Sequence, residues 1–210
     1  MVFGLDQIGR FVALPAQVYL PAMDLVAFPN LTPEQMATAA SILRLAIHGP
    51  SYKAPGEAEE EAQSFVTDPE RFAIAAIRAG DVVGWVGGIR GYSHALELHP
   101  LVVDPAHQRE GVGAVLTQAL EVAAAAEVYL TLHLGTDDDY AGTNLFGADL
   151  FPDPLAKLAQ IAPTADGHAY FFYLKQGFVP TGVLPDANGP GKPDILMSKR
   201  VGLVARNLGL

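Results

Sequence analysis

Three consecutive β-rich segments, followed by a glycine-rich helix start, constrain the fold of this chain more than any other feature. Short turns separate the segments, and such turns join neighbouring antiparallel strands, so the pattern predicts a β-meander. Asp104-Pro105 ends the third segment, and residues 111–127 then carry an apolar stripe at helical spacing. The three segments are residues 72–78, 82–90 and 94–103.

The elements around this meander complete one α+β domain. Thr32 and Gln35 form a capping-box pattern, which predicts a helix that ends at residues 48–50. A strand is predicted before this helix, at 23–28, and residues 57–65 carry four glutamates that predict a solvated second helix. The later predicted elements are a buried strand at 128–134, helices at 150–161 and 169–176, and closing strands at 178–184 and 194–200.

The two ends of the chain are expected to lie outside this domain. Pro15 and Pro21 interrupt residues 1–22, so we expect an N-terminal arm with one short edge strand at most. Residues 23–201 then form a single domain, and residues 202–210 form a C-terminal tail. The start of the chain lacks a signal-peptide pattern, and no apolar run approaches the ~18 residues of a spanning helix, so we expect a cytoplasmic protein without a membrane partner.

Charge and cysteine content narrow the possible functions. The chain has 13 Lys and Arg against 23 Asp and Glu, a net charge of −10, which opposes nucleic-acid binding and favours a cationic partner. Cysteine is absent from the sequence, so disulfides, thiol nucleophiles and cysteine–zinc sites are excluded, and a reducing cytosol fits. The 6 histidines are scattered, and their spacing predicts no metal site.

The segment from Val103 to Gly113 carries the strongest local signal of a ligand site. Backbone N–H groups in the first turn of a helix lack partners within the helix and face outward, so they attract anions. Gly111 and Gly113 allow a diphosphate to approach this backbone closely, and Arg109 adds a forked donor. A Gly-x-Gly pair is also common in ordinary turns between a strand and a helix, and this one matches neither a Walker loop nor a dinucleotide fingerprint.

With Gln108 three positions before Gly111, the segment resembles the acyl-CoA pyrophosphate loop of the GNAT superfamily of N-acetyltransferases, whose pattern is Gln/Arg-x-x-Gly-x-Gly/Ala. Further short sequence motifs resemble those of the aminoglycoside 6′-N-acetyltransferases within this superfamily, and they occur in the same order. They are Gly-Trp-Val-Gly-Gly at 84–88, Glu-Leu-His-Pro-Leu-Val-Val at 97–103, Leu-Gly-Thr-Asp-Asp at 134–138, Phe-Tyr-Leu-Lys-Gln-Gly-Phe at 172–178, Pro-Asp-Ala-Asn-Gly at 185–189 and Lys-Pro-Asp-Ile at 192–195.

The resemblance implies a GNAT-type α+β fold and a site for acetyl-CoA as co-substrate. In this fold a mixed central sheet, flanked by helices, places the antiparallel meander before a splayed parallel strand pair that holds pantetheine. The backbone of Leu101, Val102 and Val103 would hydrogen-bond the pantetheine arm and polarise the thioester carbonyl. The resemblance also implies a homodimer. The residues expected to hold the diphosphate are Gln108, Arg109, Glu110, Gly111, Val112, Gly113 and Ala114.

Acidic residues are expected to bind a cationic acceptor. Asp137 and Asp138 follow the carboxyl end of a predicted strand, where ligand sites of open sheets collect, although the same pattern also fits a solvated acidic turn. By the resemblance they would hold the ammonium groups of an aminoglycoside. The full set of expected acceptor-binding residues is Glu97, His99, Asp137, Asp138 and Asp186.

The acetyl transfer needs a base, because an ammonium group has no lone pair. Asp137 is the favoured base, and Glu97 or His99 acting through a water molecule is the alternative; His99 is equally typical of a core histidine. By its match to the family, Tyr173 would give a proton to the departing CoA thiolate, whereas buried tyrosines more often serve packing. Backbone N–H groups near Val102 would stabilise the oxyanion.

The sequence thus favours an aminoglycoside 6′-N-acetyltransferase that transfers acetyl directly and confers antibiotic resistance. Two alternatives stay open. The first is an acetyltransferase for another amine, such as a polyamine, a peptide N-terminus or a lysine. The second is an acyl-CoA-binding regulator without catalysis.

Overall fold

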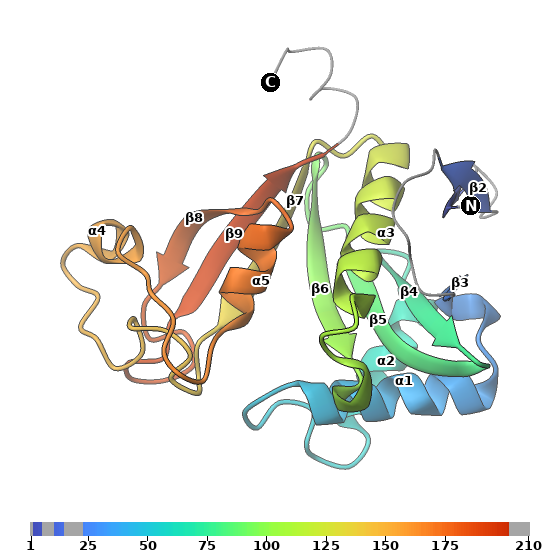
Figure 1. Cartoon of the computed structure of the whole chain (residues 1–210), viewed down its shortest axis with the longest axis horizontal. Helices are drawn as coiled ribbons and strands as arrows, with labels where there is room; N and C mark the ends of the chain where they lie inside the picture. Colours follow the sequence, from blue (N-terminus) through green and yellow to red (C-terminus); the bar gives the residue numbers. More distant parts are fainter. Residues whose placement is uncertain (1, 6–10, 15–22, 202–210) are drawn as a thin grey trace. The chain divides into compact units, whose positions relative to one another are not determined.

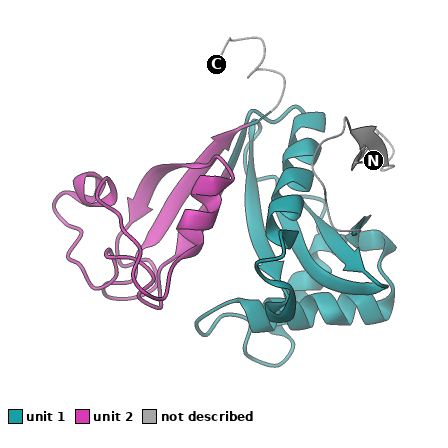
Figure 2. Ribbon diagram, viewed as in Figure 1, with its two compact units in different colours: residues 1–132, 201–210 teal, residues 133–200 magenta. Residues whose placement is uncertain are grey.

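The computed structural model describes residues 2–5, 11–14 and 23–201, and its chain divides into two compact units (Figure 1). The first unit comprises residues 1–132 and 201–210, and the second comprises residues 133–200 (Figure 2). Within the described ranges, the structure contains no helix with the length and apolar character needed to cross a membrane.

The N-terminal arm contains two strands. β1 (Val2–Leu5) and β2 (Phe11–Leu14) pair antiparallel and form a small sheet of their own. The expectation of one edge strand at most is therefore wrong, because both strands precede Pro15 and Pro21 and neither proline interrupts them. The rest of the arm and the tail at 202–210 lie outside the described residues.

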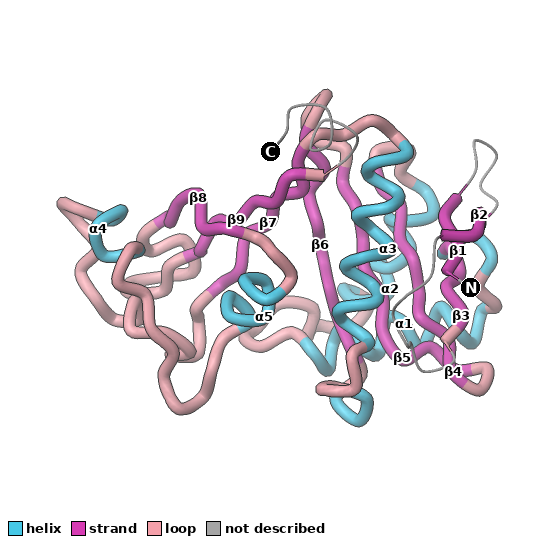
Figure 3. Tube along the Cα trace, turned by 45° about the horizontal axis from the view of Figure 1, so that its top comes forward, coloured by secondary structure: helices cyan, strands magenta, loops and turns pink. Residues whose placement is uncertain are grey.

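The sheet of the first unit contains the antiparallel meander that the sequence predicts, which is formed by its last three strands, with an earlier strand paired antiparallel at the edge. Its neighbouring strands are β3 (Asp24–Ala27), β4 (Arg71–Arg78), β5 (Asp81–Ile89) and β6 (Ala95–Val103). Helix α3 (Val112–Ala126) covers one face of this sheet, and α1 (Pro33–Ala46) and α2 (Glu57–Thr67) cover the other (Figure 3). Two 3-10 helices, η1 (Phe28–Asn30) and η2 (Pro105–His107), follow β3 and β6.

The predicted capping box begins α1 as expected. Thr32 Oγ1 accepts a hydrogen bond from the Gln35 backbone N–H at 3.2 Å, and the Gln35 side chain accepts one from the Thr32 N–H at 3.0 Å. Gln35 Nε2 also donates to the carbonyl of Gly80, at 2.9 Å, and so ties the start of α1 to the β4–β5 turn. The helix ends at Ala46, before the predicted stop.

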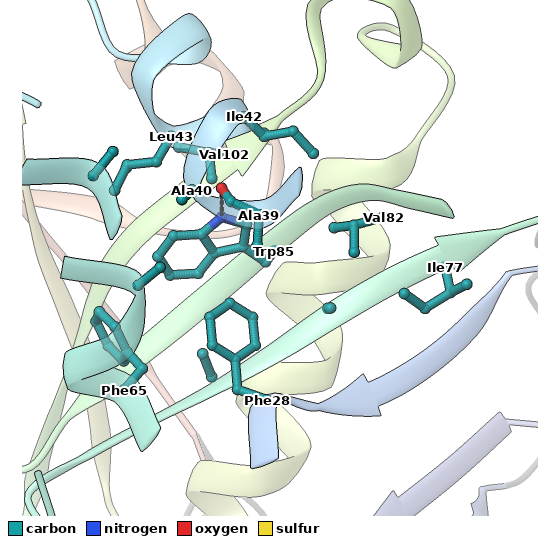
Figure 4. Close-up of a cluster of buried hydrophobic side chains, with 14 residues drawn as sticks. Phe28, Ala39, Ala40, Ile42, Leu43, Phe65, Ile77, Val82, Trp85 and Val102 are labelled. Atoms are coloured by element: carbon teal, nitrogen blue, oxygen red, sulfur yellow. Dashed lines mark hydrogen bonds between the residues drawn. The ribbon is translucent and has the colours of Figure 1, made fainter. Parts of the chain in front are cut away.

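Trp85 occupies the centre of the core between the sheet and the helices α1 and α2, as Figure 4 shows. Its ring centroid lies 4.9 Å from that of Phe28 and 5.5 Å from that of Phe65. Its Nε1 donates to the Ala39 carbonyl at 2.9 Å, which satisfies the buried indole polar group. This core packs against β6 through Val102, on the strand that carries part of the candidate site.

The second unit contains further strands and two short helices. β7 (Thr131–Asp137) continues from the first unit into the second, and β9 (Asp194–Arg200) lies between β7 and β8 (Val179–Leu184) in the sheet. β8 and β9 are antiparallel. The helices are α4 (Pro154–Leu158) and α5 (Ala169–Lys175).

Two predicted boundaries in this part of the chain are wrong. The strand expected at 128–134 begins three residues later, because Val128 adopts a left-handed φ of +65° and its N–H still bonds back to Ala125. Burial then alternates along β7, whereas the sequence suggested a continuously buried strand. The helix expected at 150–161 is confined to α4, because Asp153 caps it, its side chain accepting from the Ala156 N–H, and a proline follows directly at the first helical position.

Candidate active site

A β-bulge near the middle of β6 shapes the first part of the site. Val86 pairs with Leu101 and Gly88 pairs with Leu98, so the two residues between them on β6 oppose Gly87 alone. A Cβ atom on Gly87 would lie 2.2 Å from the His99 carbonyl oxygen and 2.4 Å from Cε1 of the Phe65 ring. Position 87 therefore has room for glycine and for no larger residue.

The bulge decides which backbone groups of β6 are available to a ligand. The Asp104 N–H donates to the Val83 carbonyl at 3.0 Å, and hydrogen-bonded pairs alternate along an antiparallel ladder. In the register that pairs Val102 with Trp85, the N–H of Val102 therefore points toward β5. The N–H groups of Leu101 and Val103 point away from β5. Of the N–H groups near Val102 that the sequence pointed to, those of Leu101 and Val103 are thus the ones that do not face β5.

The side chain of His99 lies on the face of β6 that α2 covers. Its Nε2 atom lies 3.2 Å from the Tyr52 hydroxyl and 3.6 Å from Glu61 Oε1. Val102, three residues later, packs in the core of that same face, because the bulge shifts the alternation by one residue. Glu97 lies before the bulge and is partly exposed, as the acceptor-binding hypothesis requires.

The loop between β6 and α3 has the backbone of an anion site. Arg109 has a φ of +66° and Gly111 a φ of +88°, and such left-handed residues turn successive N–H groups toward one side of a loop. Gly111 is the N-cap of α3, and within the described residues no side chain caps the helix there. The N–H groups of Val112, Gly113 and Ala114 thus remain at the positive end of the helix dipole.

Side chains around this loop hold it in place without capping the N–H groups at the start of α3. Gln108 Nε2 donates to the Val103 carbonyl at 3.3 Å, which fastens the loop to the end of β6. The carboxylate of Glu110 accepts from Arg78, which is the main reason that its pKa is lowered, and it lies 3.3 Å from His107 Nδ1. Arg109 is exposed and forms no ion pair with the described part of the chain.

The second unit presents Asp137 at the carboxyl end of β7. Its side chain is exposed, and its Oδ1 accepts a hydrogen bond from Asn188 Nδ2 at 2.5 Å. Asn188 belongs to the turn between β8 and β9, which Asp186 stabilises by accepting from the Gly191 N–H at 2.6 Å. One carboxylate oxygen of Asp186 therefore holds the turn that presents Asn188 to Asp137.

Asp138 has a structural position, in contrast to its neighbour. Its carboxylate is fully buried and accepts from the Gly142 N–H at 2.8 Å, the Thr143 N–H at 2.9 Å and the Thr143 hydroxyl at 2.6 Å. Side chains alternate along the strand, so Asp137 points outward where Asp138 points inward. Asp138 anchors the following loop, and it is not available to bind an acceptor as the sequence suggested.

Tyr173 is buried in α5 among aromatic rings. Its ring centroid lies 5.2 Å from that of Phe172 and 5.6 Å from that of Phe178. Burial raises the pKa of the Tyr173 hydroxyl well above its ordinary value, so the hydroxyl keeps its proton. His168 begins the same helix and contacts the backbone carbonyl of Asp137 through Nε2 at 3.0 Å, which links α5 to the end of β7.

Four residues of this geometry were not identified from the sequence: Tyr52, Glu61, His168 and Asn188. Asn188 lies within the Pro-Asp-Ala-Asn-Gly motif, so the sequence resemblance could have identified it as a candidate site residue. Glu61 looks like its solvated neighbours in the sequence, and its contact with His99 depends on tertiary packing.

Comparison with known proteins defines the class of this site. The model described as the acetyltransferase (GNAT) family matches residues 39–146, just over half of the chain. The chain therefore belongs to the GNAT acetyltransferase family. The resemblance stated from the sequence is confirmed, as is the GNAT-type α+β fold with a mixed central sheet flanked by helices.

Several solved structures are similar to this chain over most of its length. An aminoglycoside 6′-N-acetyltransferase in complex with coenzyme A has 36% identity and a TM-score of 0.77, covering 84% of this chain and 96% of that chain. The aminoglycoside 6′-N-acetyltransferase from Enterococcus faecium has 36% identity, the same coverage of 84% and 96%, and a TM-score of 0.74. An aminoglycoside 6′-acetyltransferase of type Ii has 31% identity, a TM-score of 0.63, and coverage of 86% and 97%. A search of curated proteins gave no match.

Proposed function

We propose that this protein is an acetyl-CoA-dependent aminoglycoside 6′-N-acetyltransferase that acetylates its acceptor directly and so provides antibiotic resistance. The observation that carries the proposal is the 36% identity to aminoglycoside 6′-N-acetyltransferases over 96% of their chains. The acidic composition of the chain, with a net charge of −10, supports a polycationic acceptor.

The loop before α3 fits the diphosphate of coenzyme A. The N–H groups of Val112, Gly113 and Ala114 supply donors without requiring a basic protein, and Arg109 adds a positive charge. Three residues shape the loop. Gln108 ties it to the end of β6, and Glu110 ties it to Arg78. Gly111 supplies a left-handed backbone conformation. Bound acetyl-CoA would supply the thioester carbonyl carbon, to which the acceptor nitrogen forms its new bond. The N–H groups of Leu101 and Val103 are the β6 donors available to its oxygen.

Asp137 is the proposed base, and it takes the proton that the acceptor nitrogen loses. Its carboxylate is exposed to an incoming ammonium group, and Asn188 holds one of its oxygens in place. Glu97 and His99 form the alternative route, in which a water molecule relays the proton. Together with Asp186, whose second carboxylate oxygen can accept a further hydrogen bond, these residues make up the proposed acceptor-binding set.

Tyr173 completes the proposed chemistry when the thiolate departs. Because burial raises its pKa, Tyr173 keeps the proton on Oη, so it would act on the departing sulfur by donating a hydrogen bond and would not transfer the proton outright. As the bond to the acceptor nitrogen forms and the bond to sulfur breaks, Tyr173 would donate a hydrogen bond to the departing thiolate, which would take up its proton from solvent.

A direct assay tests this function. Purified protein is incubated with acetyl-CoA and kanamycin, spermidine or a lysine peptide, thiol release is followed, and mass spectrometry locates the added acetyl group. We expect turnover with kanamycin and an acetyl group on its 6′ nitrogen. Turnover confined to spermidine or peptide would assign the protein to another amine, and coenzyme A binding without any turnover would favour a regulator.

We also propose that the protein is a cytoplasmic homodimer. The exposed apolar side chains of Val179, Leu184 and Leu196 on β8 and β9 support a self-association surface, and the absence of cysteine suits a reducing compartment. Light scattering after size-exclusion chromatography should give twice the chain mass of 22.2 kDa. A mass of one chain across the micromolar range would contradict the dimer.

A further inference from the structure

One glutamate of α2 differs from its neighbours on the same helix. Glu57, Glu59 and Glu60 are exposed, as the sequence predicts for a solvated helix. Glu61 keeps only 19% of its side chain exposed, and it faces the bulge of β6. The solvated assignment of this helix is therefore wrong at Glu61, which is a half-buried carboxylate with fixed partners.

Those partners fix the position of the carboxylate and direct it at His99. Arg71 donates to Glu61 Oε1 at 2.9 Å and to Ser64 Oγ at 3.1 Å, so it ties the carboxylate to the first strand of the meander. The same Oε1 lies 3.6 Å from Nε2 of His99, whose side chain is 38% exposed. The Tyr52 hydroxyl approaches the same nitrogen to 3.2 Å.

A second side chain of α2 lies near the bulge, against Gly87. Phe65 is four residues after Glu61, on the same face of the helix. Its ring occupies the space that a side chain on Gly87 would need, directly opposite the bulge that contains His99. Helix α2 thus reaches Gly87, opposite the bulge, through Phe65, and the imidazole of His99 through Glu61.

The chemistry of these groups decides which nitrogen of His99 carries its proton. The pKa of Glu61 is lowered, chiefly by the nearby imidazole of His99, with Arg71 adding to the effect against burial. Glu61 is therefore ionised, and a carboxylate oxygen 3.6 Å from Nε2 favours a proton on that nitrogen. In the neutral imidazole, Nδ1 then carries the lone pair.

We propose that Glu61, together with Tyr52, is a positioning residue for His99, which holds the neutral imidazole with its proton on Nε2 and its lone pair on Nδ1. That lone pair accepts a hydrogen bond from the acceptor amine or from the water that relays its proton. The role in turnover rests on the proposed acetyltransferase function, whereas the tautomer of His99 does not.

The test compares Glu61→Gln with Glu60→Gln, which removes the same charge from the next, exposed position. Nitrogen-15 spectra of the six imidazoles give the tautomer of each, and the His99 signals are assigned by their loss in His99→Gln. We expect His99 to be the Nε2–H tautomer in the wild type and in Glu60→Gln. In Glu61→Gln we expect a mixture of tautomers and a kcat about tenfold lower, with the KM for acetyl-CoA unchanged.

If His99 keeps its wild-type tautomer in Glu61→Gln, the proposal is overturned. An equal loss of kcat in Glu60→Gln would also overturn it, because it would indicate a general effect of charge. If the wild type acetylates none of the acceptors, the proposed function fails while the spectra still decide the tautomer. Tyr52→Phe gives a second test should Glu61→Gln fold poorly, and it should shift the His99 signals in the same direction by a smaller amount. Unchanged His99 signals in Tyr52→Phe would remove Tyr52 from the proposal.

Discussion

The loop before α3 and the carboxyl end of β7 are built by opposite means. The loop offers backbone N–H groups, whose direction depends on the left-handed conformations of Arg109 and Gly111. The end of β7 offers a side chain, Asp137, whose direction depends on Asn188 from a distant turn. A backbone site can therefore be lost through conformational strain, whereas a side-chain site can be lost through one missing contact.

The largest expected effect is at the side-chain site. Asp137→Asn removes the proposed base and should lower kcat by at least about a hundredfold, the lower range of general-base contributions. The dissociation constant of coenzyme A, measured by calorimetry, should stay unchanged. Asp139→Asn removes the same charge two residues away and serves as the control. A kcat of Asp137→Asn within threefold of the wild type would move the base to Glu97 or His99.

The complementary change is at the backbone site. Gly111→Ala places a Cβ atom in a left-handed residue, at a cost of about 1–2 kcal/mol, although the described residues leave open space around it. Relief of this strain should shift the N–H groups and raise the dissociation constant of coenzyme A about tenfold.

Gly91→Ala is the matched control for that measurement. A Cβ atom on Gly91 also meets no described atom within 4 Å, and its φ lies outside the left-handed region. We expect wild-type affinity in Gly91→Ala. Equal weakening in both variants would show that the backbone conformation of the loop is not what recognises the coenzyme.

Asn188→Ala should have a smaller effect, at the same side-chain site as Asp137. The carboxylate keeps its charge but loses the amide that orients it, so we expect kcat to fall about fivefold and the affinity for coenzyme A to stay the same. Steady-state kinetics with kanamycin as acceptor give both values. An unchanged kcat would show that the turn between β8 and β9 does not position Asp137.

The smallest expected effect concerns Tyr173 and the pH dependence of stability. Its pKa is raised in the folded state, so above the ordinary value of 10.0 the folded protein holds a proton that the unfolded chain has lost. The free energy of unfolding should therefore fall as the pH rises from about 9 to about 11. Urea unfolding across this range should show a steeper fall in the wild type than in Tyr173→Phe. Parallel curves would contradict the raised pKa.

The features that the sequence predicted correctly are those that depend on residues close together in the chain. The capping box of Thr32 and Gln35, the meander and the start of α3 all follow from residues close in the chain, and the structure contains each of them. The backbone of the loop before α3 belongs to this group, because glycine spacing at a helix start is a local signal, while its binding of a diphosphate stays a prediction.

What the sequence could not predict depends on register and on contacts between distant segments. The direction of the Val102 N–H follows from a bulge that Gly87 makes possible, and the burial of Asp138 follows from a loop that folds back on it. Glu61 and Asn188 gain their positions through partners 38 and 51 residues away. The residue pattern within a single segment cannot predict these contacts between distant segments.

The bulge opposite Gly87 limits which substitutions the residues around it can accept. The Phe65 ring and the His99 carbonyl oxygen both lie within 2.4 Å of the place that a Cβ atom on residue 87 would take. A smaller residue at 65 would make room for an alanine at 87 on the helix side, but the His99 carbonyl would still exclude it on the strand side. Variation in this region should therefore be found at position 65 before it is found at position 87.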